Sequence, residues 1–151
     1  GLNRVVERYP GTADVVIGAL SKEGGGRLKP HKSHRNGLDI DIGYYYKDNV
    51  QLKYFTPMNE DNLDVEKTFF LIESLISTGM VEYIFMNYSL QKLFHEHAQE
   101  LGYGEDALDE LFQYPGGKKT KAGIIRHAKG HNKHFHVRIY SLEMQATEDV
   151  E

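Results

Sequence analysis

The sequence predicts an α+β fold. Apolar residues recur at helical spacing over 65–76, whereas segments 38–46 and 134–140 alternate apolar and polar residues as half-buried strands do. The chain has 151 residues, of which 40% are hydrophobic and 26% charged, enough for one domain with a hydrophobic core. We therefore expect a single domain over 1–151, with its core at about 13–140 and loosely packed ends.

The first predicted elements lie in the N-terminal third. Val15 to Leu20 is an apolar run typical of a short buried strand. The three glycines at 24–26 predict a turn and also allow backbone to approach a substrate closely. Residues 38–46 are typical of a strand that carries its aliphatic residues on one face and Asp39 and Asp41 on the other.

Helices and strands follow in the remainder of the chain. Apolar residues at steps of four, three and four mark one face of a helix over about 64–78, with Asp64 or Asn62 as its N-cap and Gly79 as its stop. The later elements are predicted to be a strand at 81–86, a helix from 90 that ends at Gly102, a short acidic helix within a loop region at 103–121, and a strand at 134–140.

Composition narrows the class of protein. No apolar run approaches the ~18 residues of a membrane span, and Gly1 to Tyr9 is too polar for a signal peptide. Gly1 in place of Met suggests a processed chain or a fragment of a longer protein. With no cysteine, a metal ion would need His, Asp or Glu as ligands. The net charge of −4 and the lack of a nucleic-acid-binding motif disfavour nucleic acid as a partner.

Basic residues concentrate in two segments, 22–35 and 118–138. Together they contain 12 of the 18 Lys and Arg residues but one of the 22 Asp and Glu residues. Single lysines are usually solvated loop residues, but both segments adjoin histidine-rich fragments. The distribution therefore favours an electropositive cleft for an anionic substrate.

Five of the eight histidines fall in two fragments that lie far apart in the chain. The first is HKSHRNGLDID at 31–41, and the second is GHNKHFHVRI at 130–139. Imidazole and carboxylate groups supply the three protein ligands of many catalytic zinc ions, with water in the fourth position. The two fragments are therefore interpreted as two halves of one zinc site.

Two histidines separated by one residue can serve one site only in a strand. Residues i and i+2 share a face there, whereas in a helix they point about 200° apart. His95 and His97 lie in a helical pattern, so we expect them at the surface. His134 and His136 alternate with apolar residues, so together with Arg138 they line one polar strand face. That face is either a metal site or simply solvent-exposed.

The first fragment favours the metal site. Asp39 and Asp41 face the same side of their strand, and His34 precedes it in a loop that can turn back toward it. Exposed polar faces would explain each strand separately. They would not explain why a histidine-bearing loop precedes one such strand and a histidine-bearing strand recurs later.

The two fragments also carry a family resemblance. HxSHxxGLDxDI at 31–42 and GHxxHFHVRI at 130–139 resemble the penicillin-insensitive murein endopeptidases, zinc peptidases related to lysostaphin and the D-Ala-D-Ala metallopeptidases. Segment 81–86 and the helix after it are similar too, so the resemblance covers roughly 13–140. One departure is the absence of cysteine. The resemblance implies one zinc ion per chain, bound by His34, Asp41 and His136, with His131 and His134 lining the site. It also implies a small antiparallel sheet that carries the zinc site and is flanked by helices.

The remaining roles follow from that site. The chain has no HExxH helix and no glutamate beside the histidines, so we assign the general base to His134. His131 would orient the substrate or stabilise the developing oxyanion. Asp39 would hold a ligand ring or an arginine, unless it forms a surface salt bridge. Arg138 would bind a substrate carboxylate or pair with Asp39. Tyr44 to Tyr46 either stack on the substrate or belong to the core. Two further candidates for supporting the site or binding substrate are His31 and Ser33.

The resemblance implies hydrolysis of the amide between D-alanine and meso-diaminopimelate in peptidoglycan cross-links, and hence a periplasmic or secreted protein. Two alternatives remain. One is a D,D-carboxypeptidase or another cell-wall amidase on the same scaffold. The other is a non-catalytic wall-binding module, against which the intact ligand set argues, because a decayed site is expected to lose at least one ligand.

Overall fold

The computed structural model describes residues 1–18, 21–22 and 38–140. His31, Ser33 and His34 lie outside these residues, as do the glycines at 24–26 and the segment from 141 onward. The elements are α1 (Leu2–Arg8), β1 (Ser21–Lys22), β2 (Leu38–Gly43), a 3-10 helix (Lys47–Asn49), α2 (Val65–Ile76), β3 (Val81–Met86), α3 (Tyr88–Glu100), α4 (Glu105–Leu111), β4 (Ile125–His127) and β5 (His134–Ile139).

The strands form one mixed sheet in the order β1-β2-β5-β3-β4. Neighbouring strands are antiparallel except β3 and β4, which are parallel. The α+β class is confirmed, and the sheet differs from the expected antiparallel one only at the parallel pair of β3 and β4. Strand β4 has three residues, too few for a recognisable alternation, and it follows β3 through the helical connection α3–α4, which allows parallel pairing.

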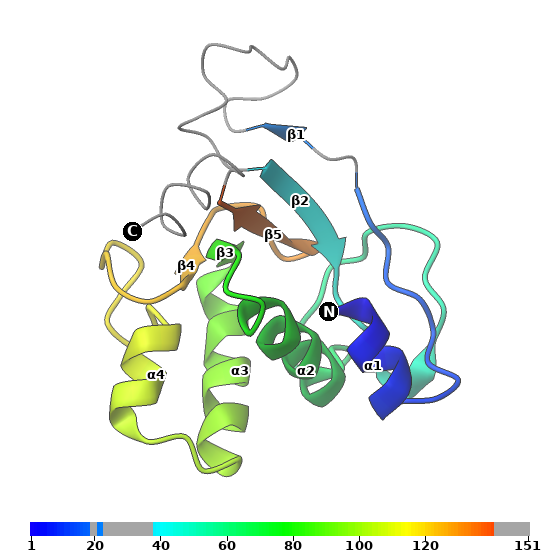
Figure 1. Cartoon of the computed structure of the whole chain (residues 1–151), viewed down its shortest axis with the longest axis horizontal. Helices are drawn as coiled ribbons and strands as arrows, with labels where there is room; N and C mark the ends of the chain where they lie inside the picture. Colours follow the sequence, from blue (N-terminus) through cyan, green and yellow to red (C-terminus); the bar gives the residue numbers. More distant parts are fainter. Residues whose placement is uncertain (19–20, 23–37, 141–151) are drawn as a thin grey trace, which may run out of the picture.

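Helices α2 and α3 lie on one side of the sheet (Figure 1), where the apolar faces of the strands pack against them. Phe135 and Val137 of β5 are at most 1% exposed, and Phe69 of α2 and Phe94 of α3 are fully buried. Because side chains alternate along a strand, His136 points to the opposite face of the sheet. The core therefore lies beneath the sheet and the histidines lie above it.

Helix α2 begins and ends where the sequence predicts. The Asp64 carboxylate accepts a hydrogen bond from the Lys67 N–H at 3.0 Å, which caps the first turn. Gly79 follows the helix with a φ of +76°, a conformation that glycine adopts without steric cost. The predictions of β3, α3, α4 and β5 are likewise confirmed. Within the described residues no helix is long and apolar enough to cross a membrane.

Three elements differ from expectation near the N-terminus. Helix α1 was not predicted, because 2–8 is mostly polar, yet Val5 is fully buried. Short helices form in proteins through packing rather than propensity, and α1 packs against α2. Residues 15–18 do not form a buried strand: Ile17 is 51% exposed and makes only an isolated bridge with Ile42. Strand β2 ends at Gly43, before the tyrosines.

The expectation that His95 lies at the surface is also wrong. Its exposed fraction is 8%, because its ring packs edge-on against Phe112 at 5.3 Å and Tyr114 at 5.1 Å. His97 is half-buried, with its ring 5.6 Å from that of Phe69. Helical periodicity indicates which residues share a face, but it does not show that the chain after α4 returns to cover His95.

Candidate metal centre

Asp41 of β2 and His136 of β5 are directly paired in the sheet. The Nδ1 atom of His136 lies 2.7 Å from Oδ1 of Asp41. Its second ring nitrogen, Nε2, lies 2.9 Å from Oδ1 of Asp39. A single imidazole therefore spans two carboxylates of the neighbouring strand, as expected if Asp39 and Asp41 share the polar face of β2.

This arrangement bears on metal binding. A neutral imidazole has one N–H and can donate to only one of the two carboxylates. Both contacts are satisfied when His136 is an imidazolium, or when a cation takes the place of the proton between Nδ1 and Asp41. Metal-bound histidines usually donate their other ring N–H to a carboxylate, which is where Asp39 lies. The donor set thus fits a metal ion held by Asp41 and His136.

His134 lies beside this pair. Its Nδ1 atom is buried and has no hydrogen-bond partner among the described residues. It lies 3.7 Å from Oδ1 of Asp41, which is too long for a hydrogen bond. Burial lowers the pKa of His134, although the Asp41 carboxylate opposes that shift. The ring is therefore neutral at pH 7 and has a lone pair available for a proton.

The backbone of His131 is fixed from two sides. Its N–H donates to Oδ1 of Asn87 at 3.1 Å, and its carbonyl accepts from the Tyr44 hydroxyl at 2.9 Å. Its ring Nδ1 lies 3.0 Å from the Lys129 carbonyl. Because a carbonyl only accepts, Nδ1 carries a proton, and in the neutral ring Nε2 keeps a lone pair. The ring centroid lies 5.1 Å from that of His134.

Asp39 is a buried carboxylate rather than part of a surface salt bridge. Its exposed fraction is 3%, and Oδ1 accepts from Nε of Arg138 at 3.1 Å. Asp39 thus contacts both the ring of His136 and the guanidinium of Arg138. Pairing with Arg138 offsets part of the desolvation penalty of the buried carboxylate.

The tyrosines after β2 belong mainly to the core. Tyr44 is 2% exposed and Tyr45 is 5% exposed, and the Tyr44 hydroxyl supports the His131 loop instead of facing a substrate. Sequence reasoning missed Asn87 and Phe55. Asn87 directly precedes α3, a position that predicts a helix cap, yet its side chain makes no cap hydrogen bond and holds His131 instead. The Phe55 ring lies 4.7 Å from that of His134.

Residues 1–18, 21–22 and 38–140 contain no group of three His, Asp or Glu side chains that could hold a metal ion. This part of the chain includes Asp41 and His136 but not the third predicted ligand, His34. The ligand set of His34, Asp41 and His136 therefore stays a prediction.

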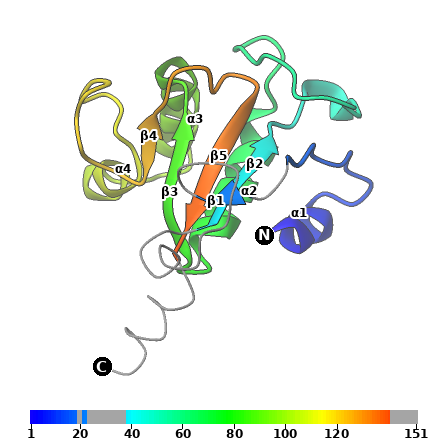
Figure 2. The same ribbon diagram turned by 90° about the horizontal axis from the view of Figure 1, so that it is seen from above.

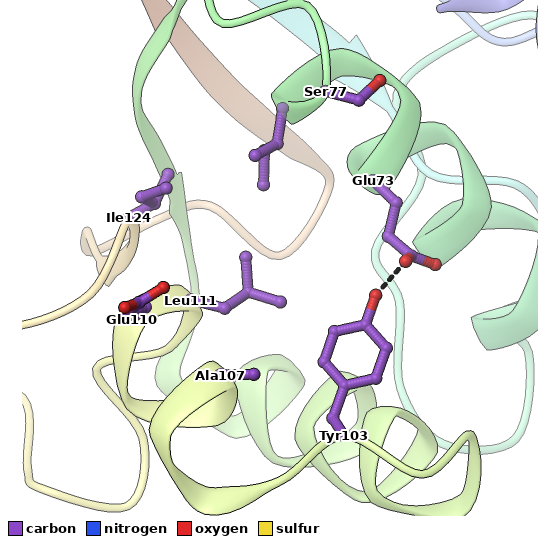
Figure 3. Close-up of a pocket in the computed structure, with 8 residues that line it drawn as sticks. Glu73, Ser77, Tyr103, Ala107, Glu110, Leu111 and Ile124 are labelled. Carbon is purple, nitrogen blue, oxygen red and sulfur yellow. Dashed lines mark hydrogen bonds between the residues drawn. The ribbon is translucent and has the colours of Figure 1, made fainter.

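A separate cavity of about 290 Å³ lies among α2, α4 and Ile124 (Figure 3). Half of the residues that line it are aliphatic, and the Tyr103 hydroxyl donates a hydrogen bond to the Glu73 carboxylate at its edge. None of the residues lining the cavity is a histidine or an aspartate. It is therefore distinct from the candidate metal centre.

Comparison with protein-family models supplies independent evidence for the family of this chain. The model of the penicillin-insensitive murein endopeptidases matches residues 1–100. The matched range includes the fragment with Asp39 and Asp41 and ends before the histidines at 131–136. A search among curated proteins finds no match. Because the match covers 100 of the 151 residues, this chain belongs to the penicillin-insensitive murein endopeptidase family.

Proposed function

We propose that the protein is a zinc-dependent D,D-endopeptidase that hydrolyses the amide between D-alanine and meso-diaminopimelate in peptidoglycan cross-links. Family membership supports a peptidase that acts on peptidoglycan in the periplasm or outside the cell. The observation that carries the metal part of the proposal is His136, whose two ring nitrogens each face a carboxylate.

One zinc ion would be held by His34, Asp41 and His136. Nitrogen and oxygen ligands suit zinc, and a site with three protein ligands leaves one position open, as in catalytic zinc centres. Asp39 would fix the orientation of His136 through Nε2. When bound, zinc polarises the scissile carbonyl and makes a water molecule easier to deprotonate.

His134 would act as general base and then as general acid. Its neutral ring can take the proton of the attacking water as the water oxygen bonds to the carbonyl carbon. The same ring can then give that proton to the amine nitrogen as the carbon–nitrogen bond breaks. A buried Nδ1 that has no partner in the described part of the chain is unfavourable by about 1–3 kcal/mol, and an incoming proton donor would relieve that penalty.

His131 would position the substrate. With Nδ1–H directed at the Lys129 carbonyl, the neutral ring presents Nε2 as an acceptor for a substrate N–H. Stabilising an oxyanion would require the imidazolium form, in which Nε2 is a donor. The electropositive cleft predicted from the sequence is also part of this proposal. One of its two basic segments lies almost entirely outside the described residues, which omit 23–35.

The test is to incubate the protein with purified cross-linked muropeptide dimers and to identify the products by mass spectrometry. We expect conversion to monomers that stops with a chelator and resumes with added zinc. The variant His97→Gln, on the helical side of the molecule, serves as a matched control and should stay active. Release of terminal D-alanine from uncross-linked pentapeptides, with dimers intact, would identify a carboxypeptidase instead. Binding to peptidoglycan without products would identify a wall-binding module.

A further inference from the structure

A row of side chains crosses the sheet from the candidate metal centre to strand β4. Asp41 pairs with His136, His136 pairs with Phe85 of β3, and Phe85 pairs with Arg126 of β4. Directly paired residues project from the same face of a sheet, so Arg126 and His136 lie on one face. Neighbouring strands are ~4.8 Å apart, which places the two Cα atoms on the order of 10 Å apart.

Two aromatic rings fill the space between them. The Phe85 ring lies 6.0 Å from that of His136 and 5.8 Å from that of Tyr83. The guanidinium of Arg126 lies over the Tyr83 ring at 4.5 Å. Tyr83, Phe85 and Arg126 are all half-buried, so their rings and guanidinium retain accessible surface. Together with the Arg138 guanidinium, which lies over the Phe85 ring at 5.3 Å, they form a row of rings and cations that leads from the candidate metal centre to Arg126.

Arg126 is held in one orientation. Its Nε donates to the Gly123 carbonyl at 2.9 Å. Gly123 has a φ of +82°, and a Cβ at this position would lie 2.4 Å from the Phe112 carbonyl carbon, so only glycine fits and the direction of its carbonyl is set. The cation–π contact with the Tyr83 ring further restricts the position of the guanidinium.

The outer edge of this guanidinium lacks an anionic partner within the described residues. Among the described residues Arg126 forms no ion pair, and its one side-chain hydrogen bond uses Nε. Arg138, on β5, which is separated from β4 by β3, instead pairs with Asp39. The terminal nitrogens of an arginine match the two oxygens of a carboxylate and bind it bidentately. An oriented guanidinium at the end of an aromatic surface is therefore a built receptor for a carboxylate.

We propose that Arg126, Tyr83 and Phe85 form a carboxylate-binding subsite for the substrate peptide. The inference rests on the proposed function and adds a specificity determinant to it. A free carboxylate would bind Arg126 while the adjoining chain lies over the two rings. An extended peptide covers ~3.3 Å per residue, so this carboxylate lies about three residues from the scissile amide. Stem peptides of peptidoglycan carry free carboxylates of this kind.

The experiment compares two cross-linked muropeptide dimers, one with its free carboxylates and one synthesised with primary amides in their place. The wild-type protein should prefer the carboxylate dimer by about 10- to 100-fold in kcat/KM. Arg126→Gln should raise KM for that dimer by a similar factor, leave kcat unchanged and abolish the preference. The KM of Arg126→Lys should lie between those of the wild type and Arg126→Gln, because lysine keeps the positive charge but cannot bind a carboxylate bidentately.

Arg4→Gln is the matched control, because it removes an arginine from α1, where Arg4 donates to Ser77, and it should behave as wild type. Zinc content and thermal midpoint establish that Arg126→Gln is folded. If it is not, Tyr83→Leu replaces it, with the same expected loss of preference. A folded variant that keeps the preference, or that loses kcat at constant KM, overturns the subsite and leaves the endopeptidase proposal intact. Failure of the wild-type protein to cleave either dimer overturns both.

Discussion

Asp39 contacts His136 diagonally across the sheet. The residue paired with His136 is Asp41, and Asp39 precedes Asp41 by two positions on the same face of β2. Oδ1 of Asp39 nevertheless lies 2.9 Å from Nε2 of His136. The ring is thus held at both nitrogens by one strand. The Asp-x-Asp spacing suits this geometry, because residues two apart are the nearest neighbours on one face of a strand.

Replacing Asp39 tests whether this contact supports the metal. Asp39→Asn keeps an acceptor for Nε2 but loses the charge that favours a fixed, basic imidazole. We expect zinc affinity to fall by about 10- to 100-fold, as measured by competition with a chromophoric chelator. Asp48→Asn, in the exposed 3-10 helix, is the control and should bind zinc as the wild type does. Equal affinity in both variants would mean that Asp39 only supports the fold.

The predicted metal ligands are tested by measuring the zinc content of the protein and its variants. The wild-type protein should contain one zinc ion per chain, and His136→Ala should lose the metal and the activity together, because a ligand is removed outright. Elemental analysis and hydrolysis of cross-linked dimers are measured on the same samples. A metal found on His95 or His97 instead would contradict this assignment.

His134 should separate binding from turnover. His134→Ala is expected to keep zinc and to lose kcat by about 10²- to 10⁴-fold, the usual contribution of a general base. The checks are zinc content and kcat at saturating substrate. If the variant also loses its zinc, His134 is a ligand and the roles assigned to His134 and His136 are wrong.

The positions of the candidate site residues that the structure describes follow largely from the alternation of apolar and polar residues in the sequence. Alternation along 38–43 and 134–139 places Asp41 and His136 on polar faces, and this is confirmed by their contact. Alternation does not set register, so the choice of Arg138 as the partner of Asp39 could be raised but not decided from sequence. The pairing of β2 with β5 decides it.

The rest depends on contacts between distant segments. Strand β4 is too short to be recognised, so the sequence places Arg126 in a basic segment but not beside Tyr83. Likewise, Asn87 is recognisable as a potential cap, whereas its bond to His131 depends on the loop before β5. The burial of His95 has the same origin, since Phe112 and Tyr114 come from the chain after α4.

His95 also leads to a prediction about pH. Burial lowers its pKa below the ordinary value of 6.5, although Asp109 and Glu96 oppose the shift. As pH falls through 6.5 the unfolded chain takes up the proton first, so the free energy of unfolding decreases until the lowered folded-state pKa is reached. The stabilisation is fully present above pH 6.5 and is lost below it, by about 1.4 kcal/mol per unit of pKa difference.

The variant His95→Gln removes this titration. Urea unfolding of both proteins from about pH 7.5 to about pH 5.5 should show that the stability advantage of the wild type over the variant shrinks as pH falls. Comparison at the upper pH isolates the loss of ring packing against Phe112 and Tyr114, because His95 is neutral there in both states. Other groups that titrate in this range, including His134, are present in both proteins and cancel in the difference. A difference that stays constant with pH would show that His95 does not contribute to acid destabilisation.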